Sequence, residues 1–164
     1  MSNKIITKSN SWDEFTNALT PLNNKERGNA FELLTELLLQ IDPVYRTSLK
    51  HVWHHTTIPK HLITKLGLAR KEIGFDLVAE SKDGKYWAIQ CKYHHDPSKN
   101  VTLNELQSFS DMTQNVCKGK FHTCLVVTSA NNYAKNLQKY HPEFQYCLGD
   151  RFLSLETSFF KDAR

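Results

Sequence analysis

Two short stretches decide the fold of this chain: Ile73-Gly74-Phe75-Asp76-Leu77-Val78-Ala79 and Trp87-Ala88-Ile89-Gln90-Cys91-Lys92. Both are rich in apolar residues, and the polar segment Ser81-Lys82-Asp83-Gly84-Lys85 separates them. Apolar runs on either side of an Asp-Gly pair are typical of a β-hairpin. The two stretches therefore predict strands over residues 73–80 and 86–93, joined by a tight turn.

The length of that turn decides which side chains share a face of the hairpin. A two-residue loop (Asp83-Gly84) would send Gln90 and Lys92 to the face away from Asp76. A three-residue loop (82–84) would set Asp76 opposite Gln90, with Lys92 on the same face. We predict the three-residue loop, because its last position favours the left-handed backbone that glycine adopts easily.

The residue types on this face favour one kind of chemistry. The Asp76 carboxylate is a hard ligand suited to Mg²⁺, with Mn²⁺ as a substitute. The Gln90 amide and the Cys91 backbone carbonyl offer two further oxygen atoms. Lys92 can orient and help deprotonate an attacking water, or offset charge that develops on a phosphate. The hairpin therefore predicts metal-assisted hydrolysis of phosphodiester bonds, with the Cys91 carbonyl and the side chains of Asp76 and Gln90 as metal ligands.

The size and charge of the chain are compatible with this prediction without requiring it. The 164 residues fit one domain, and 40% of them are hydrophobic, enough for a buried core. The formal net charge of +4 permits a polyanionic partner, but many unrelated proteins are as basic. Composition alone therefore excludes a disordered chain and decides little about function.

The cysteines and the N-terminus bear on location. The four cysteines lie at positions 91, 117, 124 and 147, and none of them belongs to a C-x-x-C pair. Three of the four lie in apolar, strand-like runs. This pattern favours a reducing compartment without disulfides or a zinc site. The first eleven residues lack the apolar core of a signal peptide, and no run is long enough to span a membrane. We therefore expect a cytoplasmic protein without a membrane partner.

Capping signals and apolar periodicity predict the remaining elements. Helices are expected over 12–19, 24–40, 59–66, from Thr102 onwards and over 131–140, with a helical turn capped by Asp150. Further strands are expected over 50–58, 121–128 and 144–148. Helices on both sides of one mixed sheet make an α/β domain.

Two segments of the chain resemble the PD-(D/E)xK nuclease superfamily, and specifically its Mrr-like restriction endonuclease branch. They are Gly74-Phe75-Asp76-Leu77-Val78-Ala79 and Ala88-Ile89-Gln90-Cys91-Lys92. Glutamine often replaces the acid before x-Lys in that branch, as Gln90 does here. The segment 27–32 resembles the family's first core helix, whose glutamate faces the metal. That assigns Glu32 to the metal site and to catalysis, although Glu36 lies one turn later on the same helix and competes for the role.

The resemblance covers roughly residues 24–150 and implies a restriction-endonuclease-like αβββαβ core, a central mixed sheet flanked by helices. It also implies a Mg²⁺-dependent endodeoxyribonuclease that acts on DNA in a restriction or defence system. We expect residues 1–22 to form an N-terminal helical extension and 23–164 the nuclease domain. Similar domains begin larger restriction enzymes, which implies a helicase–translocase region in the same polypeptide. Dimerisation for double-strand cleavage is left open.

Several polar side chains are candidates for DNA contact. A basic run precedes Asp76, His94 continues the face of Lys92, and Gln107 faces outward from the helix predicted after Thr102. The DNA-binding set is Lys60, Lys65, Arg70, Lys71, His94 and Gln107. The other histidines are expected at structural or surface positions, because a doublet such as His54-His55 points to opposite sides of a strand.

Two other functions compete with a restriction nuclease. A junction-resolving nuclease uses a similar fold and would favour an obligate dimer on branched DNA. A DNA-binding module of the same fold without catalytic activity is the second, and the presence of Asp76, Gln90 and Lys92 together argues against it.

Overall fold

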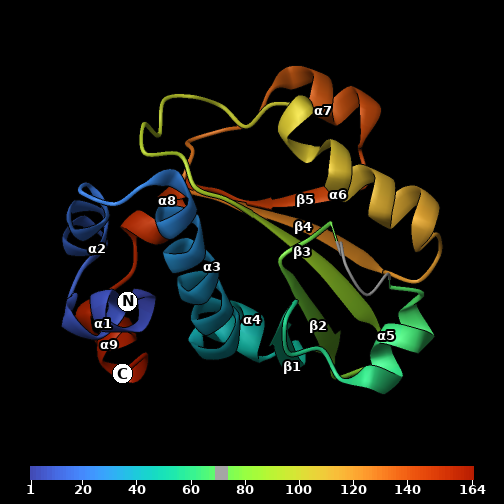
Figure 1. The fold of residues 1–164 in the computed structure, drawn as a ribbon, viewed down its shortest axis with the longest axis horizontal. Coiled ribbons are helices and arrows are strands. Elements are labelled where there is room, and N and C mark those ends of the chain that lie inside the picture. The colour runs from blue at the N-terminus through green and yellow to red at the C-terminus, as the bar shows by residue number, and fades with distance from the viewer. Residues whose placement is uncertain (69–73) are drawn as a thin grey trace.

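The computed structural model describes residues 1–68 and 74–164, and it shows a five-stranded sheet between two layers of helices (Figure 1). The strands lie in the sheet in chain order: β1 (Leu49–His54), β2 (Leu77–Ser81), β3 (Tyr86–Lys92), β4 (Thr123–Thr128) and β5 (Phe144–Cys147). β1, β2 and β3 pair antiparallel, whereas β3, β4 and β5 pair parallel. The predicted α/β class with a mixed sheet is confirmed.

Helices from both ends of the chain cover one face of the sheet (Figure 1). They are α1 (Ser2–Lys8), α2 (Trp12–Leu19), α3 (Asn24–Ile41), α8 (Gly149–Leu153) and α9 (Thr157–Asp162). Phe31 and Leu34 of α3 belong to the same buried cluster as Ile89 of β3. Burial of such side chains is the main source of stability for the layer. The short helix α4 (Pro43–Arg46) links α3 to β1.

The other face is covered by three shorter helices, α5 (Lys60–Leu66), α6 (Gln107–Asp111) and α7 (Lys135–Tyr140) (Figure 1). Leu62, Phe109 and Leu137 of these helices pack with Val78 of β2 in a second buried cluster. Both faces of the sheet are therefore buried, and polar chemistry is confined to its edges and strand ends.

Local signals explain where α3 begins. The side chain of Asn23 accepts a hydrogen bond from the Glu26 amide, and the Glu26 side chain accepts one from the Asn23 amide. This reciprocal capping fixes the first turn. Arg27 then donates to the Leu19 and Thr20 carbonyls at the end of α2. The helix is thus held at its first turn, one turn before Glu32.

The hairpin has the predicted turn. Leu77 pairs with Ile89, and the same register continues to the pair of Glu80 and Tyr86. The Ser81 amide donates to the Lys85 carbonyl at 2.8 Å, which leaves residues 82–84 as the loop. Gly84 has φ +81°, the left-handed conformation that this loop needs. The three-residue loop is confirmed.

Several predicted elements differ in extent. The strand expected over 73–80 begins at Leu77, after bends at 74–76. The helix expected over 131–140 begins at Lys135, because the backbone at Tyr133 bridges to Val101. The helix after Thr102 is interrupted: a 3-10 turn at Asn104–Leu106 precedes α6, and a π-helical turn at Met112–Val116 follows it. The strand expected over 50–58 ends at His54.

The four cysteines are buried and free, as expected for small hydrophobic side chains without disulfides. Among the described residues, no helix is long and apolar enough to cross a membrane.

Candidate active site at the open end of the hairpin

Asp76 is fixed by the neighbouring strand. It lies one residue before β2, where its amide donates to the Ile89 carbonyl at 3.0 Å. Its carboxylate accepts a hydrogen bond from the Cys91 amide, with 2.7 Å between Oδ2 and the nitrogen. Among the described residues, the pairing of β2 with β3 begins at Leu77, so Asp76 forms no ladder pair with Gln90. Its hydrogen bonds to Ile89 and Cys91 hold it instead. The carboxylate is therefore positioned before any ligand arrives.

Glu32 reaches the same point from α3. Its carboxyl group interacts with that of Asp76, because each of the two changes the pKa of the other. Its Oε2 atom also lies 2.9 Å from Nε2 of His54. Glu36, the competing acid one turn later, is half-buried, and its pKa is raised by burial and lowered by His54. The structure therefore brings Glu32 to Asp76, as the resemblance implies.

The two carboxyl groups perturb each other. Burial, and then the negative charge of Glu32, raise the pKa of Asp76 to about 7, although the Cys91 amide and Lys92 lower it. Burial also raises the pKa of Glu32, against the opposing effects of Asp76 and Lys92. Two acids this close hold a proton between them near neutral pH.

A divalent cation fits this donor set. A cation can take the place of the shared proton and neutralise both carboxylates, which are hard oxygen ligands. The Cys91 amide points at Asp76, and the carbonyl of a strand residue points to the same side as its amide. The Cys91 carbonyl oxygen therefore also faces this end of the hairpin. The residues present fit a metal such as Mg²⁺ or Mn²⁺.

Gln90 and Lys92 lie two residues apart at the end of β3, and both are half-buried. The charge of Lys92 lowers the pKa of both Asp76 and Glu32, which places its ammonium group near the two carboxylates. The Lys92 carbonyl accepts a hydrogen bond from the Thr128 hydroxyl at 2.7 Å, so β4 holds the end of β3. Lys92 thus stands beside the acids on a fixed backbone.

Two histidines join the site from the end of β1. One ring nitrogen from each of His54 and His55 and one carboxylate oxygen of Glu32 all lie within 4.8 Å of one another. The expectation that the doublet points to opposite sides is wrong, because β1 ends at His54 and His55 already belongs to the following turn. Burial, and then His54, lower the pKa of His55. No spacing signal in the sequence places this pair beside Glu32.

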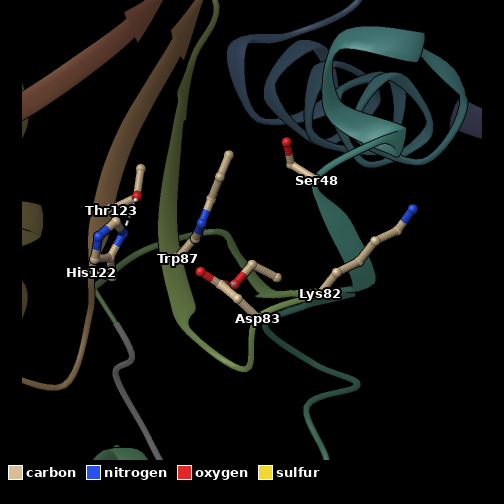
Figure 2. Close-up of a pocket in the computed structure, with 7 residues that line it drawn as sticks. Ser48, Lys82, Asp83, Trp87, His122 and Thr123 are labelled. Atoms are coloured by element: carbon tan, nitrogen blue, oxygen red, sulfur yellow. Dashed lines mark hydrogen bonds between the residues drawn. The ribbon is translucent and has the colours of Figure 1, made fainter.

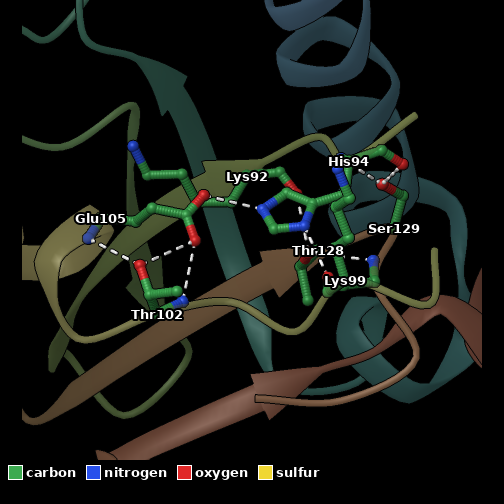
Figure 3. A network of polar contacts seen from close by, with 8 residues as sticks. Lys92, His94, Lys99, Thr102, Glu105, Thr128 and Ser129 are labelled. Atoms are coloured by element: carbon green, nitrogen blue, oxygen red, sulfur yellow. Dashed lines mark hydrogen bonds and ion pairs between the residues drawn. The ribbon is translucent and has the colours of Figure 1, made fainter. Parts of the chain in front are cut away.

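His94, a predicted DNA contact, is engaged inside the protein (Figure 3). Its Nε2 lies 2.7 Å from Oε1 of Glu105, and its Nδ1 lies 2.6 Å from the Lys99 carbonyl oxygen. Its amide donates to the Ser129 hydroxyl at 2.7 Å. Although partial burial raises the pKa of Glu105, the Thr102 amide and His94 lower it below its usual value. This network ties the loop after β3 to the start of the next helical segment.

The other predicted DNA contacts that the structure describes lie on two helices, α5 and α6. Lys60 and Lys65 are exposed on α5, and Nζ of Lys65 lies 5.1 Å from the centre of the Tyr86 ring. Tyr86 begins β3 and Lys92 ends it, about 20 Å apart at the rise of a strand. Gln107 lines a groove between α6 and α7. Arg70 and Lys71 fall outside the described residues.

A separate cleft lies at the opposite, closed end of the hairpin (Figure 2). Its volume is about 330 Å³, and it is lined by Ser48, Ser81, Lys82, Asp83, Trp87, His122 and Thr123. None of these residues belongs to the predicted site. The catalytic candidates therefore gather at the open end of the hairpin.

The comparison with protein families decides the class. A family model described as restriction endonuclease (Mrr_cat_2) matches residues 40–146, more than half of the chain. The chain belongs to this restriction endonuclease family. The match includes Asp76, Gln90 and Lys92, whereas Glu32 precedes it. The predicted resemblance is confirmed, and so is the general class of a nuclease of a restriction system.

Solved structures support the fold of this restriction endonuclease domain. An ATP-dependent type ISP restriction–modification enzyme, LlaBIII bound to DNA, is similar with a TM-score of 0.62 and 23% identity. The similarity covers 84% of this chain but 8% of that one. AF1548, a protein of unknown function, is similar with a TM-score of 0.50 and 18% identity, over 71% of this chain and 56% of that one. No curated protein matches the chain.

Proposed function

We propose that this chain is a Mg²⁺-dependent DNA endonuclease domain, with Mn²⁺ able to replace Mg²⁺. The observation that carries the proposal is the mutual perturbation of two half-buried carboxyl groups, those of Asp76 and Glu32, on which the charge of Lys92 also acts. Two acids and a lysine at one strand end form a site for a cation and a phosphate together. Membership of the restriction endonuclease family supports DNA as the substrate.

In this proposal each residue has a distinct role. Asp76, Glu32, the Gln90 amide and the Cys91 carbonyl hold the metal. When bound, the metal polarises the phosphate and lowers the pKa of a water molecule. Lys92 either orients that water and helps to remove its proton or, as an ammonium group, offsets charge on the phosphate. The Cys91 amide keeps the Asp76 carboxylate in place through its 2.7 Å hydrogen bond.

The proposal extends to DNA and to a larger protein. We propose that Lys60, Lys65, Arg70, Lys71 and Gln107 contact the DNA backbone, and that His94, whose ring nitrogens face Glu105 and the Lys99 carbonyl, holds the loop after β3 in place. Residues 1–22 would be a helical extension of the nuclease domain, 23–164. Because the similar LlaBIII enzyme is ATP-dependent and far longer, we further propose that a helicase–translocase region belongs to the same polypeptide here.

Cleavage of supercoiled plasmid tests the proposal. The wild type is compared with Asp76→Ala, Lys92→Ala and the control Lys82→Ala, each at low salt in Mg²⁺, Mn²⁺ or EDTA. Lys82 is exposed at the closed end of the hairpin, so the control removes a lysine away from the site. We expect metal-dependent nicking or linearisation that falls about 100-fold or more in the two site variants and persists in the control. Equal cleavage by all four proteins would contradict the proposal.

A further inference from the structure

The end of β1 brings two imidazoles to the flank of the carboxylate pair. His55 is fixed there by its backbone, because its amide donates to the Asp76 carbonyl at 2.9 Å. The His54 ring lies beside it, with 4.1 Å between the ring centres. With Glu32, the two rings offer one oxygen and two nitrogen ligand atoms within 4.8 Å of one another. Ligands about 2.1 Å from a tetrahedral metal lie roughly 3.4 Å apart, so small side-chain rotations would close this set.

The hydrogen bonds of His54 hold its ring against Glu32. Its Nε2 faces Oε2 of Glu32 at 2.9 Å, whereas its Nδ1 accepts a hydrogen bond from the Thr56 amide at 3.3 Å and lies 2.8 Å from the Thr56 hydroxyl. A neutral imidazole that binds a metal through Nε2 carries its proton on Nδ1. In that tautomer the Nδ1 proton would be donated to the Thr56 hydroxyl oxygen, and the bond that Nδ1 accepts from the Thr56 amide would be given up. Metal-binding histidines generally give their second nitrogen such an outer partner, which sets the ring orientation.

The ligand types distinguish this set from the oxygen ligands around Asp76. Mg²⁺ prefers oxygen ligands, whereas imidazole nitrogen favours Zn²⁺, Co²⁺ and Ni²⁺. Two histidines and one carboxylate bind such ions while leaving a coordination position open. We infer that Glu32, His54 and His55 form a second cation site, selective for a divalent transition metal such as Zn²⁺, Co²⁺ or Ni²⁺. Glu32 is shared with the Asp76 site, so a transition metal bound here competes with Asp76 for that carboxylate.

Binding of Co²⁺ to the intact chain tests this inference, because the visible d–d absorption of Co²⁺ changes when protein ligands replace water and lower the coordination number. We expect one equivalent per chain in the wild type. His54→Gln and His55→Gln should each weaken binding about tenfold or more. His51→Gln, on the same strand but exposed and outside the cluster, is the matched control and should bind as the wild type does. Circular dichroism on heating shows that each variant remains folded.

Asp76→Ala separates this site from the nuclease proposal. We expect this variant to keep its Co²⁺ spectrum, because Asp76 is not one of the three ligands, even though it should not cleave DNA. Loss of the spectrum in Asp76→Ala would show a single cation site and overturn the inference. Unchanged binding in both His54→Gln and His55→Gln, or equal loss in His51→Gln, would also overturn it. Neither result depends on whether the wild type cleaves plasmid.

Discussion

The carboxyl groups of Asp76 and Glu32 change each other's pKa, although one side chain comes from the hairpin and the other from helix α3. Two acids that interact in this way ionise together only at a cost in free energy, unless a cation neutralises them. The folded state is therefore destabilised when both groups ionise without a cation. A site of this kind is prepared for a cation, and its properties without metal can be measured separately from cleavage.

The first prediction concerns stability against pH without metal. The pKa of Asp76 is raised from 3.8 to about 7 in the folded protein. Between those values the folded state holds a proton that the unfolded state lacks. The resulting stability is fully present below about pH 4 and is lost as the pH rises through about 7. Asp76→Asn cannot ionise, so at pH 8 in EDTA we expect it to be about 2 kcal/mol more stable than the wild type.

Urea unfolding in EDTA at pH 5 and pH 8 checks this prediction. The difference between Asp76→Asn and the wild type should be larger at pH 8 than at pH 5. Asp111→Asn is the control, because Asp111 is exposed. Removal of its charge should change the free energy of unfolding by the same small amount at both pH values. An Asp76→Asn variant that is less stable than the wild type at pH 8 would contradict the prediction.

The second prediction concerns stabilisation by metal. A ligand that binds only the folded state stabilises it by about 2.7 kcal/mol at a concentration one hundred times its Kd. Mg²⁺ or Mn²⁺ at pH 8 should therefore raise the melting temperature of the wild type. Asp76→Asn should show little or no increase, whereas Asp111→Asn should respond as the wild type does. Thermal unfolding followed by circular dichroism measures this, and an equal increase in all three proteins would place the metal elsewhere.

The hairpin could be predicted from the sequence because its determinants are local. Gly84 is the residue that the left-handed turn position requires, and the turn sets the register of both strands. The positions of Asp76 and Lys92 near each other follow from that register. The hydrogen bond from the Cys91 amide to Asp76 could not be predicted from the sequence, because it depends on which residue begins the pairing of β2 with β3.

The rest of the site depends on contacts between distant segments. The family resemblance assigned Glu32 to the site, but helical periodicity alone could not exclude Glu36, and the packing of α3 on the sheet brings Glu32 to Asp76. The position of His55 depends on where β1 ends, which strand propensity does not specify within a few residues. Helix α7 begins late for the same kind of reason: Tyr133 bridges to Val101 in place of a helical turn.

The third prediction concerns the loop after β3. The Glu105 carboxylate accepts hydrogen bonds from the Thr102 amide and from His94, each at 2.7 Å. Glu105→Gln removes the charge from both bonds and should cost about 1–2 kcal/mol of unfolding free energy. Glu143→Gln is the matched control, because Glu143 makes a longer, 3.1 Å contact to His141. Urea unfolding at pH 7 measures both, and equal losses would contradict a special role for the Glu105 network.

The last prediction concerns the glycine two residues before Asp76. Gly74 has φ +75°, and a Cβ atom added there would lie 2.2 Å from Cγ of Met112 and 3.2 Å from the Ser108 carbonyl oxygen. Gly74→Ala therefore combines backbone strain with a clash against the α6 region, and should cost about 3 kcal/mol. Gly84→Ala has a similar φ of +81° but meets nothing within 4 Å, so about 1 kcal/mol is expected from strain alone.

The difference between the two alanine variants isolates the clash from the backbone cost. Because relief of the clash must displace residues next to Asp76, Gly74→Ala should also weaken metal binding, whereas Gly84→Ala should not. Urea unfolding and titration with Mn²⁺ on the same preparations measure the two effects. Equal destabilisation by both substitutions would show that the segment before β2 can shift to accommodate the added methyl group at little cost. The close approach of Gly74 to Met112 would then not help to position Asp76.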